Sequence, residues 1–215
     1  MDFLTAVFLG VLSSLIVVMF VEWMRKPRLS LSILPPEEVG LYGGDGVLIE
    51  RYVGLKVGVC NDALPFIFRW MQRQSARDCR ATLHFLREDK TLFITRPMPG
   101  RWAGSVQPVP LQGIIRPTME TIEIHDVARL TAESRIHIPA GEAENLDVAV
   151  RFPTAAEAFG WTNDSYRHGG RHPNFVLPVG RYLVDVIVQS EGVKKRDCFR
   201  IENDHTIDEF RLAPL

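Results

Sequence analysis

LPVGRYLVDVIVQSEGVKKRDCFRIEND, residues 177–204, contains the clearest strand pattern of this 215-residue chain. Apolar residues recur at every second position in RYLVDVIVQ (181–189) and in CFRIEN (198–203), with Ser190-Glu191-Gly192 between the two runs. Such alternation is typical of half-buried strands, and glycine between two runs is typical of a turn. The stretch therefore predicts two β-strands joined by a tight turn.

The same alternation recurs through the residues that precede this stretch. It is present in RLSLSIL (28–34), GLKVGVCN (54–61), CRATLHFL (79–86), ETIEIHD (120–126), SRIHIPAG (134–141) and NLDVAVRF (145–152). Turn residues separate most of the runs, and the glycine-rich GLYGGDG (40–46) lies between two of them. We predict a hairpin loop there, with phosphate binding as the weaker alternative because no helix or lysine follows. About eight short strands with this spacing indicate an all-β sandwich.

A resemblance supports this fold class. IPAGEAENLDVAV (138–150) and residues 177–204 resemble the closing half of bacterial immunoglobulin-like sandwiches, and LKVGVCND (55–62) with ARDCRATLHFL (76–86) is similar to their opening pair. The chain also resembles uncharacterised single-span prokaryotic proteins. The resemblance implies an immunoglobulin-like β-sandwich over residues 28–215, interrupted by insertions near 63–78 and 153–176. It implies no activity, because one fold serves many functions.

The chain begins with a different kind of segment. Nineteen residues from Phe3 to Val21 carry no charge, and as a helix they would span about 28 Å, close to the ~30 Å hydrocarbon core of a bilayer. A cleaved signal peptide is the alternative, but it has a shorter apolar run, a basic start and a small-residue cleavage site. We predict an uncleaved transmembrane α-helix within an anchor of residues 1–27.

The flank VEWMRKPR (21–28) predicts the orientation of this anchor. Arg25, Lys26 and Arg28 follow the apolar run, and basic residues beside a span stay on the cytoplasmic side. Trp23 is typical of the membrane interface, and a proline at residue 27 stops the helix. We therefore predict a single-pass protein of the inner (cytoplasmic) membrane, with its N-terminus outside and residues 28–215 in the cytoplasm. Three cysteines, an odd number without a CxxC motif, favour a reducing compartment.

Three small residues of the anchor are spaced four apart. Ala6, Gly10 and Ser14 would lie along one side of the helix, where small side chains let two membrane helices approach closely. This face predicts self-association of the chain. Small residues are also common in membrane helices that do not pair, so an anchor without pairing is the alternative.

The first insertion combines basic and aromatic residues. Arg69, Trp70, Arg73 and Arg77 lie in LPFIFRWMQRQSARDCR (64–80), and one or two helical turns would align the arginines. Three interpretations stay open: aromatic side chains that cover one end of the sandwich, contact with anionic lipid headgroups, or an acidic protein or nucleic-acid partner. The net charge of −1 argues against a dedicated nucleic-acid binder.

The second insertion, TAAEAFGWTNDSYRHGGRHPNF (154–175), is rich in hydrogen-bonding groups. Asp164, His168 and His172 can approach one another in a loop, and His125 and His137 can approach from neighbouring strands. Zinc sites usually have tighter Cys/His spacing. We therefore predict a structured loop with Trp161 and Tyr166 buried, and no metal.

The sequence contains no GxSxG, HExxH or GxxxxGK[ST] motif. We predict no enzymatic activity and no cofactor. The leading hypothesis is a protein-binding or scaffolding module, with the lipid bilayer, an unknown protein and a second copy of the chain as partners. The alternatives are a sensor or effector that acts on the bilayer and oligomerises through its anchor, or an exported adhesion module if the orientation is reversed.

Overall fold

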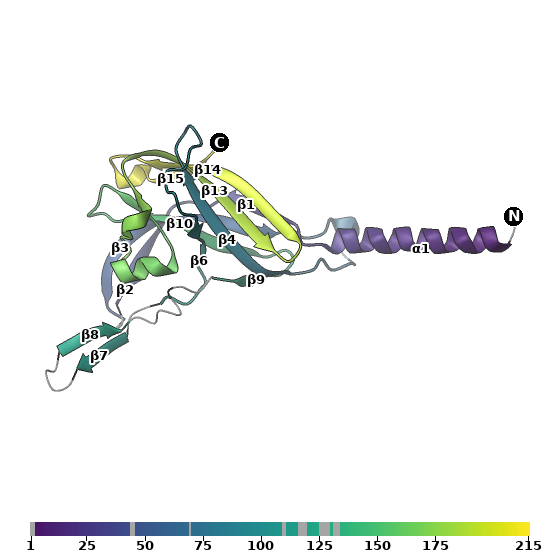
Figure 1. The fold of residues 1–215 in the computed structure, drawn as a ribbon, viewed down its shortest axis with the longest axis horizontal. Helices are drawn as coiled ribbons and strands as arrows, with labels where there is room; N and C mark the ends of the chain where they lie inside the picture. The colour runs from purple at the N-terminus through teal and green to yellow at the C-terminus, as the bar shows by residue number, and fades with distance from the viewer. Residues whose placement is uncertain are drawn as a thin grey trace.

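The computed structural model describes residues 3–43, 46–68, 70–108, 111–115, 120–124, 130 and 134–215 (Figure 1). Helix α1 (Phe3–Arg25) comes first and extends away from one end of a β-rich body, as Figure 1 shows. The helix is long and apolar enough to cross a membrane, and its residues Val7–Arg25 are not buried inside the molecule. The predicted apolar N-terminal helix is confirmed.

Within the described residues, the first of two main sheets contains seven strands. Strands β1, β3, β10, β11 and β12 follow one another across it, while β2 pairs with β3 and β6 pairs with β10. Its strands are β1 (Leu29–Ile33), β2 (Glu37–Tyr42), β3 (Leu48–Asn61), β6 (Arg101–Trp102), β10 (Ala143–Arg151), β11 (Ala158–Gly160) and β12 (Val176–Leu177). The hairpin of β2 and β3 pairs Tyr42 with Leu48, which confirms the hairpin predicted around GLYGGDG.

In the part of the chain that the structure describes, the second sheet contains six strands: β15, β14, β13, β4 and β5 follow one another, and β9 also pairs with β4. Its strands are β4 (Ala76–Leu86), β5 (Met98–Pro99), β9 (Ile136–Ile138), β13 (Gly180–Ser190), β14 (Val193–Asn203) and β15 (Arg211–Pro214). β13 and β14 form the hairpin predicted from residues 177–204, with Ser190 opposite Val193 at its turn. A separate hairpin joins β7 (Leu111–Ile115) and β8 (Glu120–Ile124).

The two main sheets pack around a large hydrophobic core, as a sandwich does, and a second, smaller apolar cluster includes Tyr52, Phe152 and Trp161. Val57 of β3 and Val184, Val186 and Val188 of β13 are completely buried in the large core. Side chains two residues apart on a strand point to the same face, so the regular alternation of the sequence delivers these valines to one side. The predominantly β fold with two sheets behind one N-terminal helix is therefore confirmed.

The insertions differ from what their sequences suggest. A helical alignment of the insertion arginines is wrong: residues 66–68 form a single 3₁₀ turn (Phe66–Phe68), and Arg77 already lies on β4. Strand pairing of Ala76 with Ile138 extends β4 toward the N-terminus and excludes a helix there. The second insertion holds two strands of the first sheet, β11 and β12, besides the 3₁₀ turns Asn163–His168 and Pro173–Phe175. Its predicted burial of Trp161 and Tyr166 is confirmed.

Candidate functional site

The junction between α1 and the sandwich is hydrogen-bonded on both sides of the short connection. The carbonyl of Arg25 accepts from the N–H of Gln74 at 2.8 Å, and the N–H of Arg28 donates to the side chain of Asn61 at 3.1 Å. Trp23 stays exposed near the end of the helix. The residues predicted to orient the anchor therefore belong to a connection that fixes the sandwich directly at the end of the helix.

The basic residues of the first insertion are placed separately. The Arg73 guanidinium donates to the carbonyl of Lys26 at 3.2 Å, and burial lowers its pKa below the ordinary value. Arg77 is exposed on β4, and its carbonyl accepts a hydrogen bond from Ser190. Arg69 lies outside the described residues. The hydrogen bond of Arg73 thus connects the insertion to the end of α1, while Arg77 lies beside the β13–β14 turn.

The predicted pairing face of α1 is only partly described. Ala6 belongs to the helix, but its side chain is outside the described part. The carbonyl of Gly10 accepts from the hydroxyls of both Ser13 and Ser14 at 2.9 Å. The Ser14 hydroxyl therefore has an acceptor within its own helix. Apart from the chain neighbours of Gly10 and the nearby helix backbone, no described atom lies within 4 Å of where a Gly10 Cβ would stand. Pairing through this face stays a prediction.

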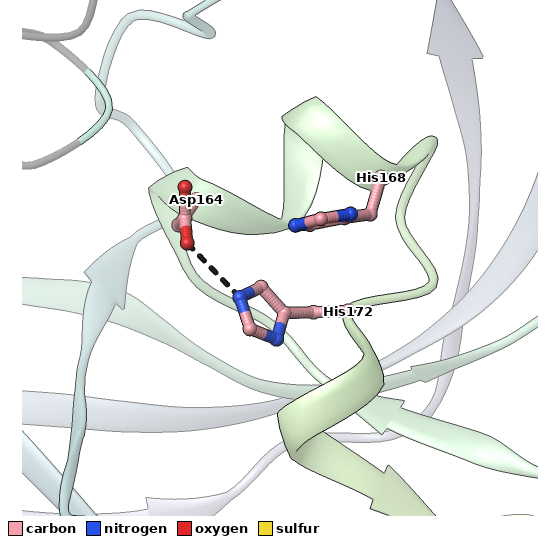
Figure 2. A group of neighbouring side chains, drawn as sticks. All are labelled: Asp164, His168 and His172. Atoms are coloured by element: carbon pink, nitrogen blue, oxygen red, sulfur yellow. Dashed lines mark hydrogen bonds and ion pairs between the residues drawn. The ribbon is translucent and has the colours of Figure 1, made fainter.

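The second insertion brings Asp164, His168 and His172 together, as Figure 2 shows. The Nε2 of His172 lies 2.9 Å from Oδ2 of Asp164, and the two histidine rings meet edge to face at 4.7 Å between centroids. Gly170 makes this fold-back possible. Its φ of +84° is unfavourable for other residues, and a Cβ there would lie 2.5 Å from the Phe152 ring.

These residue types can bind Zn²⁺ or another transition metal. Their ligand atoms lie within 4.8 Å of one another, whereas ligand atoms in a tetrahedral zinc site are about 3.4 Å apart. The Nδ1 of His172 accepts from the N–H of Asn174 at 3.1 Å. In the neutral ring this places the proton on Nε2, which then donates to Asp164.

A metal bound at Nε2 would force this proton onto Nδ1, where it would face the N–H of Asn174. The same hydrogen bond caps the 3₁₀ turn Pro173–Phe175. The ring of His172 is buried, whereas that of His168 is exposed. The arrangement therefore favours a hydrogen-bonded structural unit that fixes the insertion over a preformed metal site.

Of the other two histidines that the sequence suggests could approach each other, the structure describes only His137. His125 lies outside the described residues. The Nδ1 of His137 accepts from the N–H of Asp78, which lies at the irregularity where β4 and β9 change register. His137 thus has a structural partner on the neighbouring strand.

A cleft on the outward face of the second sheet was not predicted. It has a volume of about 700 Å³ and is lined by His84, Leu86, Lys90, Leu92, Asp185, Ile187, Arg196, Asp197, Cys198 and Leu215. His84, Asp185 and Cys198 lie opposite one another on β4, β13 and β14 and so form a row across the sheet. The charged Asp185 within a run of apolar residues was the signal in the sequence, but only the strand register reveals its neighbours.

The chemistry of this row is dominated by Asp185. Its carboxylate is buried and pairs with Arg196 at 2.7 Å rather than with a histidine. Burial raises the pKa of the Cys198 thiol, and Asp185 raises it further. A raised pKa keeps the thiol protonated and weakly nucleophilic. Cys198 is therefore a poor candidate for a thiolate nucleophile.

No protein-family model, no curated protein and no solved structure matches this chain.

Proposed function

We propose that this chain is a non-enzymatic, single-pass membrane protein that presents a β-sandwich to the cytoplasm and binds a protein partner there. The junction carries the proposal. Helix α1 ends at Arg25 and the first strand begins at Leu29, so the sandwich follows an apolar helix without a flexible linker. An exposed helix of 23 residues with this composition has a favourable environment in a bilayer.

The charges at the junction support the cytoplasmic orientation. Arg25, Lys26 and Arg28 flank the C-terminal end of the span, and Lys and Arg near a span favour the cytoplasmic side. Cys60, Cys79 and Cys198 are all free thiols. Free thiols agree with a reducing compartment, where disulfides are rare.

The order of the strands supports an immunoglobulin-like type of sandwich. In that fold strands A, B and E are neighbours in one sheet, and strands C, F and G in the other. Here β1, β3 and β10 are neighbours in the first sheet, and β4, β13 and β14 in the second. In chain order, β1, β3, β4, β10, β13 and β14 therefore correspond to strands A, B, C, E, F and G. The second insertion adds β11 and β12 beside β10, and β15 extends the other sheet.

We place the partner contact at the cleft on the second sheet. Its apolar side chains Leu86, Leu92 and Ile187 can accept an apolar side chain of a partner protein, and Lys90 and Arg196 lie beside them. Its volume lies within the range of about 300–1,000 Å³ that is typical of ligand pockets. The low nucleophilicity of Cys198 favours binding over catalysis at this cleft.

Fusion reporters test the orientation. A C-terminal alkaline phosphatase fusion should be inactive and a C-terminal green fluorescent protein fusion should be fluorescent. Changing Arg25, Lys26 and Arg28 together to Gln should give mixed orientations, because the charge bias of the flank is then lost. The same change at Arg51, Arg181 and Arg211, far from the span in sequence, should have no effect. Active phosphatase with dark fluorescent protein would reverse the proposed placement.

Site-specific photocrosslinking in cells tests the partner contact. A photoreactive amino acid at Leu92, which is 51% exposed in the cleft, should give a discrete crosslinked product. The control position is Ile49, which is 66% exposed and lies on β3 outside the cleft. Equal crosslinking from both positions, or none from Leu92, would contradict a partner site in the cleft.

A further inference from the structure

The middle of the first insertion forms an apolar tip that the sandwich does not cover. We define the aromatic turn as residues 65–68 together with residue 70. Ile67 and Trp70 are each 77% exposed and Phe66 is 82% exposed, while Leu64 and Met71 on its flanks are buried. The flanks therefore attach the turn to the sandwich and its tip points outward. The interpretation in which these aromatic residues cover the end of the sandwich does not fit this arrangement.

The aromatic turn lies beside the last turns of α1. The ring centroids of Phe68 and Phe20 are 6.2 Å apart in an edge-to-face contact. The ring centroid of Phe20 also lies 6.3 Å from that of Trp23. Phe20 precedes Arg25 by five residues, which is about 7.5 Å along a helix axis. If Arg25 lies at the headgroups, the ring of Phe68 lies closer to the hydrocarbon core than the charged residues do. The turn therefore shares the depth of the interfacial part of the anchor.

Basic groups lie at the same end of the sandwich as this apolar tip. The Arg73 guanidinium donates to the carbonyl of Lys26, and Arg77 lies at the same end of the sandwich, where Ser190 of the β13–β14 hairpin donates to its carbonyl. The hairpin residue Val193 lines a hollow of about 390 Å³ together with Trp23 and Arg73. Exposed apolar and aromatic side chains beside Arg and Lys are complementary to the boundary between lipid tails and anionic headgroups.

We propose that the aromatic turn is a second membrane contact, in which Ile67 and Trp70 enter the bilayer interface beside α1. The proposal rests on the proposed function, because it requires α1 to lie in the bilayer. Two separate contacts, the helix and the turn, fix the sandwich in one orientation on the membrane surface. The apolar tip supplies this contact without anionic lipid, and the arginines add attraction where such lipid is present.

Quenching of tryptophan fluorescence by brominated lipid tests this contact in the full chain. The protein is reconstituted in vesicles of zwitterionic phosphatidylcholine, which has no net charge, with and without brominated acyl chains. The Trp23→Phe variant leaves Trp70 as the reporter of the turn, and the Trp70→Phe variant leaves Trp23 as the reporter of the helix. Trp102 and Trp161 are at most 1% exposed, and the Trp23→Phe/Trp70→Phe variant gives their baseline.

The expected result is a loss of Trp70 emission in brominated vesicles comparable to the loss of Trp23 emission. Quenching of Trp23 with unquenched Trp70 would overturn the second contact and leave the anchor intact, including the case in which a protein covers Trp70. Trp70 quenching that appears only when anionic lipid is added would overturn the apolar insertion. If neither residue is quenched, α1 is not in the bilayer, and both the proposed function and this inference fail.

Discussion

Replacing Arg101 with Met is expected to lower the free energy of unfolding of the sandwich by about 3–5 kcal/mol. The Nη1 of Arg101 lies 2.6 Å from Oδ2 of Asp147, and the two residues are 3% and 7% exposed. Removing the guanidinium leaves a buried carboxylate without its partner, which is far more costly than losing an exposed ion pair. Urea unfolding of the full chain in detergent micelles, followed by the fluorescence of the buried Trp102 and Trp161, measures the loss.

Two further variants separate the missing charge from the missing packing. Arg51→Met breaks an ion pair of similar length, 3.0 Å to Glu38, but both partners are more than half exposed, so the cost should stay within about 1 kcal/mol. Arg101→Met/Asp147→Leu removes both buried charges and should recover much of the lost stability. Similar losses of unfolding free energy for Arg51→Met and Arg101→Met would contradict the inference that burial makes the Arg101–Asp147 pair costly to break.

The stability of the Arg101→Met variant should also depend on pH. Burial raises the pKa of Asp147, and the charge of Arg101 opposes that increase. Without Arg101 the folded-state pKa rises further, so the folded protein binds this proton more tightly than the unfolded chain. The variant should therefore come closest to the parent below the unfolded carboxyl pKa of about 3.9, and its deficit should grow as the pH rises through the folded value.

The sequence predicts the elements of this fold better than their partners. The alternating valines of β13 identify a strand because period-two patterning and burial have the same local cause. The pair of Arg101 and Asp147 has no such signature, since β6 has only two residues and its partner is far along the chain. Short strands gain their stability from the sheet that they join, and local sequence does not encode that sheet.

The candidate sites follow the same division. The spacing of His168 and His172 suggests their approach, but the hydrogen bond from Asn174 that fixes the protonated nitrogen depends on a 3₁₀ turn. The arginine spacing suggests a basic surface on the first insertion, yet its most exposed side chains, such as Ile67 and Trp70, are apolar. Long-range contacts, such as that of Phe68 with Phe20 across 48 residues of sequence, place that insertion beside α1.

Replacing Arg151 with Met should be as costly as replacing Arg101, about 3–5 kcal/mol, for a different reason. Arg151 ends β10 of the first sheet and is 3% exposed. Its guanidinium donates to Oδ1 of Asn203 at 3.0 Å and to the carbonyls of His205 at 2.9 Å and Thr206 at 3.0 Å, as well as to that of Asp204. One buried cation therefore joins the first sheet to the turn that follows β14, using neutral acceptors instead of a carboxylate.

Shape and charge can be separated at this position. Arg151→Lys keeps the charge, but one ammonium group cannot reproduce a planar fork that spans several carbonyls, so its loss should be intermediate. Arg181→Met, at an exposed position on β13, should change the stability by less than about 0.5 kcal/mol. The turn held by Arg151 leads into β15 and to Leu215, which lines the cleft. Arg151→Met should therefore weaken crosslinking from Leu92 at temperatures where the variant remains folded, and unchanged crosslinking would show that the cleft forms without this turn.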